Sequence, residues 1–341
     1  MSKSDDVERA RLLVELARVA EQEDQTAKAL GLYDDALAEF REDSVDPFLP
    51  DILRWKGTLL RERGETESAF RCYTQSLERA TLCGSERARA HALNCLGTIA
   101  QRRCDHKECE RLYSQASALA MKAGDSRLLG MIEQNRGVLA SMRGDFAQAA
   151  TFYTNSLGAF EAARDPEPIS WVLNNLGILH TKIRNFNEAR DYLERGLAIA
   201  LNRNDVVVEN VVMLNLAEVW IGLGRLDKAD EFCVAALEQA QKRGDHLTAA
   251  GALKIRAAIE RQRGALDKSI ATLRIALFEA DGAEDRLLHA EMLRELGEIS
   301  RAVGNAGAAR SAWREAVDSY QQIGANQDIA EVEADLDSLA N

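Results

Sequence analysis

The sequence predicts an all-α protein, built as a solenoid of about eight helix-turn-helix repeats with one further helix at its C-terminal end. Three series of residues that recur every forty positions carry this prediction. The first marks a loop: Gly64, Cys104, Gly144, Arg184, Gly224, Gly264 and Gly304. The second keeps a small side chain: Ala17, Gly57, Gly97, Gly137, Gly177, Ala217, Ala257 and Gly297. The third is Ala29, Ala69, Cys109, Ala149, Ala189, Ala229, Ser269 and Ala309. Self-similarity at one period of roughly 20–50 residues is typical of stacked repeats.

Residues 165–203 illustrate the two helices expected in each repeat. Asp165 is a suitable N-cap, and Pro166 takes the first helical position, where its missing amide costs nothing. Apolar residues keep helical spacing as far as Leu179. Arg184 and Asn185 then interrupt the pattern, and a second amphipathic stretch follows them. The capping residue also recurs every forty positions, as Asp125, Asp165, Asp205, Asp245 and Asp285.

The small residues of each repeat predict close contact between helices. A glycine at the Gly177 position lets the second helix approach, although glycine costs about 1 kcal/mol of helix propensity relative to alanine. At the Ala189 position the second helix meets the first helices of its own and the next repeat, so a large side chain would separate them. Larger residues at another recurring position are expected to fill the remaining gaps: Tyr33, Tyr73, Tyr113, Tyr153, Leu193, Cys233, Leu273 and Trp313.

The sequence divides into an N-terminal repeat at 1–44, a loop at 45–50, seven repeats at 51–323 and a C-terminal helix at 324–341. The loop assignment rests on the stretch from Ser44 to Pro50, which holds two of the four prolines. Gly324 ends the last repeat, and the helix after it has one apolar side formed by Ile329, Val332, Leu336 and Leu339. A capping role is expected because repeat arrays need polar-backed ends; a helix that docks a partner is the alternative.

The repeat pattern resembles the tetratricopeptide repeat (TPR) family over residues 9–323. Leu176-Gly177, Ala189, Leu193 and the small Gly196 carry the resemblance. The departures are charged residues in place of a leucine at Lys56, Arg136 and Arg256, no terminal proline, and a longer period than the family's usual one of about 34 residues. The pattern is similar to the longer repeats of LGN/Pins, kinesin light chain and bacterial regulators of the MalT and Rap type. The resemblance implies a right-handed superhelix whose first helices line a concave groove.

Composition excludes several classes of function. The net charge of −12 argues against a nucleic-acid binder. No apolar run is long enough to span a membrane, and the first ten residues lack the apolar core of a secretory signal. We therefore expect a soluble cytoplasmic protein that uses neither membrane nor nucleic acid. The six cysteines form no disulfide framework and suit a reducing compartment.

Motifs for catalysis or cofactor binding are missing from the sequence. No P-loop, HExxH or GxSxG motif occurs. Cys95, Cys104, His106 and Cys109, with His91 nearby, are the one cluster that suggests a metal site, but their spacing matches no standard zinc motif. We expect no cofactor, no metal and no catalytic residue; an enzyme built on this cluster is a rival hypothesis.

Amide side chains recur on the helices that the TPR resemblance places along the groove. They are Asn94, Asn135, Asn174, Asn175 and Asn215. An asparagine offers one acceptor and two donors, which match the amide and carbonyl of an extended peptide. The same side chains could instead bond helices of adjacent repeats, and the sequence favours neither alternative.

Groove positions also carry cations and large apolar residues. The cations are Lys182, Lys254, Arg261, Arg294 and Arg301, and the apolar residues are Met131 and Trp171. An inner wall more basic than the rest of the chain would attract an acidic segment, although Glu291 and Glu298 could pair locally with these cations. We predict a non-catalytic scaffold that binds an extended, acidic peptide or partner segment. The alternative is a bacterial regulatory or sensor module that binds a signalling peptide or small ligand and controls an effector in another chain or in a longer parent protein. Self-association through a terminal repeat is a further expectation.

Overall fold

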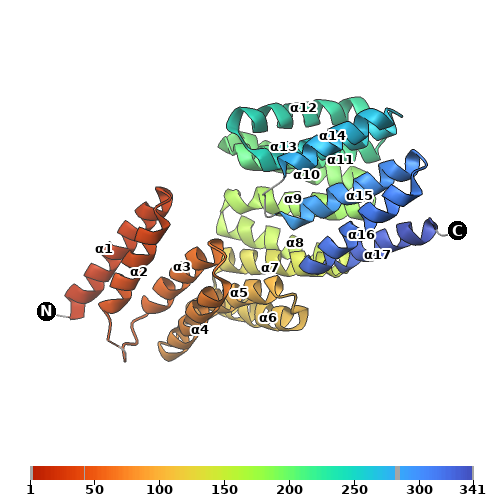
Figure 1. The fold of residues 1–341 in the computed structure, drawn as a ribbon. Helices are drawn as coiled ribbons and strands as arrows, with labels where there is room; N and C mark the ends of the chain where they lie inside the picture. The colour runs from red at the N-terminus through yellow and green to blue at the C-terminus, as the bar shows by residue number, and fades with distance from the viewer. Residues whose placement is uncertain (1–2, 42, 281–284, 340–341) are drawn as a thin grey trace. The chain divides into compact units, whose positions relative to one another are not determined.

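The computed structural model describes residues 3–41, 43–280 and 285–339. Seventeen helices and no strand occur in these ranges, as Figure 1 shows with the helices labelled in chain order. The chain divides into two compact units, Met1–Arg136 and Gly137–Asn341, and the division falls inside α7 (Ser126–Met142). The all-α repeat fold predicted from the forty-residue register is confirmed.

The first unit consists of helix pairs. Its helices are α1 (Lys3–Gln22), α2 (Thr26–Ala38), α3 (Leu49–Glu62), α4 (Thr66–Leu82), α5 (Glu86–Arg102), α6 (His106–Ala123) and the start of α7. α1 packs against α2, α3 against α4 and α5 against α6. Because α3 begins at Leu49, Pro50 lies in its first turn rather than in the preceding loop, at a position where proline fits a helix.

The second unit continues the alternation to the C-terminal helix. After the end of α7 come α8 (Phe146–Ala163), α9 (Pro166–Lys182), α10 (Phe186–Arg203), α11 (Val206–Gly222), α12 (Leu226–Arg243), α13 (His246–Gln262), α14 (Leu266–Glu279), α15 (Arg286–Ala302), α16 (Ala306–Ile323) and α17 (Asn326–Ser338). The first helices of these repeats are α9, α11, α13 and α15, and each contacts the next. The first helices therefore line one side of the stack.

The start of each capped repeat and the turn between its two helices are fixed by local backbone chemistry. The five predicted aspartate caps all accept a hydrogen bond from a backbone N–H two or three residues ahead, for example from Val208 to Asp205 at 3.2 Å. Every residue of the loop series has a positive φ, including Cys104 at 56° and Arg184 at 59°. Glycine reaches this left-handed region without steric cost, which explains why it fills most of the series.

The small residues are buried against large ones, as predicted. A Cβ atom added at Gly177 would lie 2.4 Å from Cγ of Leu193, and one added at Gly297 would lie 2.1 Å from Nε1 of Trp313. All eight residues of the Ala189 series are fully buried. Helices therefore approach more closely at the glycines than any side chain would allow.

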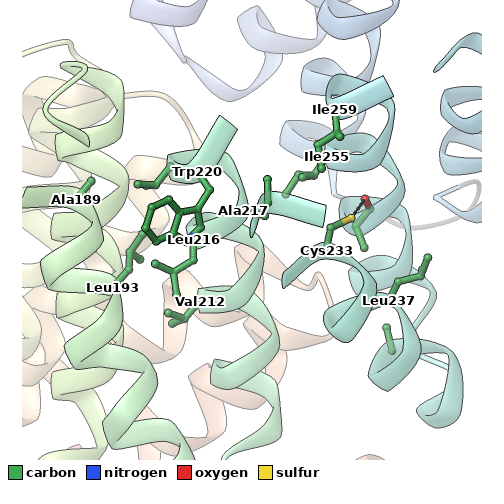
Figure 2. Packing of buried hydrophobic residues seen from close by; sticks show 14 of the residues in the cluster. Ala189, Leu193, Val212, Leu216, Ala217, Trp220, Cys233, Leu237, Ile255 and Ile259 are labelled. Atoms are coloured by element: carbon green, nitrogen blue, oxygen red, sulfur yellow. Dashed lines mark hydrogen bonds between the residues drawn. The ribbon is translucent and has the colours of Figure 1, made fainter. Parts of the chain in front are cut away.

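Figure 2 shows how this packing joins consecutive repeats of the second unit. Leu193 of α10 lies beside Val212, Leu216 and Trp220 of α11 within one buried cluster. Further along the same cluster, the Cys233 thiol of α12 donates to the carbonyl of Ala252 on α13 at 3.1 Å. Each repeat thus buries its apolar face on the next one, so neighbouring first helices are held in fixed register.

Candidate functional site

Two pairs of asparagines join the first helices of adjacent repeats. Asn135 Nδ2 on α7 donates to Asn94 Oδ1 on α5 at 3.0 Å. Asn215 Nδ2 on α11 donates to Asn174 Oδ1 on α9 at 2.7 Å. Asn94 and Asn174 are buried, so their acceptors need these partners. Four of the five predicted amides thus make the inter-repeat bonds that the sequence had left as an alternative.

Asn175 differs from the other four amides. It lies on α9, is half-buried, and its side chain makes no hydrogen bond to any other residue that the structure describes.

The two predicted apolar contacts have different surroundings. Trp171 of α9 is half-buried and packs against the cluster shown in Figure 2, so part of its ring already has a structural contact. Met131 of α7 is half-buried and belongs to the first unit.

The predicted cations of the second unit form what we call the cation face, and all five are ion-paired. The face consists of Lys182 on α9, Lys254 and Arg261 on α13, and Arg294 and Arg301 on α15.

Lys254 links three first helices. Its Nζ lies 2.6 Å from Glu291 on α15 and 3.5 Å from Glu218 on α11. Burial alone would lower the pKa of this ammonium, but the carboxylates of Glu291 and Glu218 hold it above its ordinary value. Arg261 is paired with Glu295 at 2.7 Å. These two cations are satisfied by carboxylates of neighbouring helices and serve the stack itself.

Lys182, Arg294 and Arg301 instead meet acids of the C-terminal helix. Lys182 Nζ lies 3.2 Å from Asp328 Oδ1, although the two residues are 146 positions apart. Arg294 Nη1 lies 2.8 Å from Glu331 Oε2. We call the three acids Asp328, Glu331 and Asp335 the acidic side of α17.

The third contact is weaker than the first two. Arg301 Nη1 lies 4.0 Å from Asp335 Oδ1, because its Nη2 is held by Glu298 of α15 at 2.9 Å. Burial and the nearby charge of Glu298 raise the pKa of Asp335 above its ordinary value. For Glu331, burial acts in the same direction, but hydrogen bonds from Gln327 and Arg294 lower its pKa overall. The negative charge of the Asp335 carboxylate is therefore only partly balanced by Arg301.

The apolar side of α17 caps the last repeat. Val332 is fully buried in a cluster with Trp313, Val317 and Tyr320 of α16. At the start of the helix, the Gln327 side chain lies against the α7–α8 turn, where a Cβ atom added at Gly144 would be 2.8 Å from Gln327 Oε1. The helix thus covers α16 with one side and reaches α9 with the other.

Members of the cysteine and histidine cluster differ in exposure: Cys109 is buried, Cys95 and His91 are half-buried, and Cys104 is exposed. Burial raises the pKa of the Cys109 thiol to about 12, so this thiol is protonated at neutral pH. Burial lowers the pKa of His91 to about 4. Within residues 3–41, 43–280 and 285–339, no group of three histidine, cysteine or acidic side chains is arranged to hold a metal ion. In the same ranges, no helix has the length and apolar character needed to cross a membrane.

Sequence reasoning predicted the cations but missed the residues that pair with three of them. Asp328, Glu331 and Asp335 follow i, i+3, i+7 spacing, which places them on one side of a helix. This spacing was a detectable pattern. Its partners on α9 and α15 could not be identified, because the pairing depends on how the intervening repeats curve.

The sequence matches two family models, both described as tetratricopeptide repeat, over residues 87–162 and 170–202. No curated protein matches the chain.

One of the similar solved structures is that of a signal transduction ATPase with numerous domains from Pyrococcus horikoshii, which has a tetratricopeptide repeat sensor. That match has 17% identity and a TM-score of 0.65, and covers 97% of this chain and 49% of that protein. This chain thus spans about half the length of that relative.

Two further solved structures are similar over nearly their whole length. The Rap conjugation gene regulator of the plasmid pLS20, in complex with a Phr peptide, has 13% identity and a TM-score of 0.65, with 95% of this chain and 97% of that chain covered. The apo quorum sensor NprR from B. thuringiensis has 13% identity and a TM-score of 0.59, with coverages of 98% and 99%. At these identities the similarity establishes the fold.

Proposed function

Because the chain is a tetratricopeptide-repeat protein, we propose that it is a non-catalytic interaction module that binds an acidic polypeptide segment on the cation face of its second unit. Repeat arrays offer extended surfaces rather than enclosed pockets, so a polypeptide is the ligand that fits them best. The observation that carries the proposal is that Lys182 and Arg294 already hold the carboxylates of an acidic helix.

The charge distribution supports this choice of ligand. The chain as a whole has a net charge of −12, so a negatively charged partner is repelled by most of its surface. The side chains of Lys182 and Arg301 keep 35% and 43% of their area exposed, so an incoming carboxylate can reach both. Asn175 on α9 adds an amide that can bond a peptide backbone.

The test uses a full-length variant in which two cations lose their internal partners. We call Asp328→Asn/Glu331→Gln the release variant. It removes the α17 carboxylates that pair with Lys182 and Arg294 and introduces no new charge. Fluorescence anisotropy then compares two labelled peptides. One has the sequence of residues 326–339, and the other has asparagine or glutamine in place of the three acids on the acidic side of α17.

We expect the acidic peptide to bind the release variant more tightly than the substituted peptide, which keeps only Glu333 and Asp337, and its affinity to fall as salt is raised. Lys182→Gln in this background should weaken binding about threefold, since a half-exposed ion pair contributes about 0.2–1 kcal/mol. The matched control is Lys242→Gln, because Lys242 is exposed on α12 and has no ion pair within the described ranges. Equal binding of the two peptides, or equal effects of the two lysine substitutions, would refute the proposal.

A second candidate function is that of a ligand sensor that controls an effector in a longer parent protein or in another chain. The observation that favours it is the similarity in fold to a sensor that makes up only part of a multidomain ATPase, and to a quorum sensor and a peptide-bound Rap regulator. Both candidates require a polypeptide or ligand on the repeats. They differ in whether binding changes the structure of the array, which small-angle X-ray scattering with and without the acidic peptide would measure.

A further inference from the structure

We infer that α17 is a built-in competitor for the cation face, and that the natural partner is an acidic amphipathic helix that displaces the acidic side of α17 from Lys182 and Arg294. This inference rests on the proposed function, because it names the class of partner and the means of its regulation. It changes the expected ligand from an extended peptide to a helical one.

The spacing of the acids is the first step of the argument. Asp328 and Glu331 are three residues apart, and each reaches a cation on a different first helix, Lys182 on α9 and Arg294 on α15. A helix brings side chains at i and i+3 to the same side. The face therefore already receives acids in helical register.

The position of α17 along the stack is the second step. A plain cap needs only to cover α16, and Val332 with its buried neighbours does so. Asp328 contacts Lys182, and Gln327 contacts the turn at Gly144. Neither contact contributes to the packing of α17 on α16. They place the helix across cations that a partner would need.

Incomplete pairing at the far end of α17 is the third step. Asp335 stands 4.0 Å from Arg301, whose guanidinium is held more closely by Glu298. A partner helix whose third acid reaches Arg301 at hydrogen-bonding distance would replace a weak contact by a stronger one. The acidic side of α17 is therefore a displaceable occupant.

The experiment compares three full-length proteins with the labelled acidic peptide of residues 326–339. They are the wild type, the release variant and a matched control, Asp318→Asn/Glu333→Gln. The control also removes two negative charges, one from α16 and one from α17. Both side chains are exposed and have no ion pair within the described ranges. Circular dichroism before each titration verifies that the helix content of the three proteins is equal.

We expect the release variant to bind the peptide at least about fivefold more tightly than the wild type, and the control to bind as the wild type does. Equal affinities of the wild type and the release variant would overturn the inference while leaving the proposed function intact. No binding of the acidic peptide to either protein would instead overturn the proposed function.

Two further measurements test displacement and helicity. Saturating the wild type with the peptide should speed amide hydrogen exchange in the protein's own residues 326–336, and unchanged or slower exchange would contradict displacement. A peptide with Glu333→Pro, at a position facing solvent in α17, should bind at least about tenfold more weakly than one with Glu333→Gln, because proline breaks a helix interior. Equal binding of these two peptides would contradict a helical partner.

Discussion

Gly297→Ala should destabilise the last repeat, because α15 and α16 approach too closely there for even one methyl group. The added Cβ would lie 2.1 Å from Nε1 and 2.3 Å from Cδ1 of Trp313. The indole is fully buried, and its Nε1 donates to the carbonyl of Arg294 at 3.1 Å. The ring cannot turn aside without losing this bond or entering its packed neighbours.

The size of the effect follows from three contributions. Overpacking a core costs about 1–3 kcal/mol, and loss of the indole hydrogen bond would add about 1 kcal/mol. Replacing a helical glycine by alanine returns about 1 kcal/mol through helix propensity. The net expectation is a loss of about 1–3 kcal/mol in the free energy of unfolding.

The chain offers a matched control for helix propensity. Gly158 lies inside α8, and a Cβ atom added there would meet no other heavy atom within 4 Å. Gly158→Ala should therefore stabilise the protein by up to about 1 kcal/mol. Urea unfolding followed by circular dichroism measures both variants against the wild type. If Gly297→Ala were as stable as Gly158→Ala, the close-contact explanation of the recurring glycines would be wrong.

Three other substitutions test the amides and the half-buried His91. Asn215→Ala should cost about 1–2 kcal/mol by leaving the buried Asn174 acceptor unpaired, whereas Asn175→Ala should change stability by less than about 0.5 kcal/mol, both measured by urea unfolding. His91 is kept neutral in the folded protein, its pKa lowered from 6.5 to about 4 by burial and by two nearby arginines. Its contribution is present above pH 6.5 and is lost as pH falls toward 4, by about 2–3 kcal/mol in all, so His91→Gln should flatten the fall in melting temperature over this range. An unchanged pH profile would contradict a lowered pKa of His91 in the folded protein.

Nearly all of the repeat architecture could be predicted, because it rests on local and nearest-neighbour chemistry. The loop series predicted the turns, and even Cys104 and Arg184 adopt the backbone conformation that glycine favours. The Gly177 series predicted close helix contacts, and Leu193 confirms one of them. Each of these features depends on residues within one repeat or its neighbour, so the same residues recur every forty positions and reveal it.

The amides show where residue type alone stops being informative. Asn175 and Asn215 occupy the same repeat position, yet only Asn215 has an asparagine of the preceding repeat within reach, at 2.7 Å. The side-chain chemistry is identical for the two roles. Structure was needed to separate an amide that holds two helices together from one that remains available.

The pairing of Lys182 with Asp328 could not be predicted for a different physical reason. Each repeat is rotated slightly relative to the one before it, and such rotations accumulate along a solenoid. Between α9 and α17 lie several repeats, so a small uncertainty in each rotation becomes large when summed. The sequence could therefore indicate that Lys182 and Arg294 attract an acidic segment, and that α17 is acidic on one side. It could not indicate that the fold brings the two together, so that one helix both packs on α16 and pairs with Lys182 and Arg294.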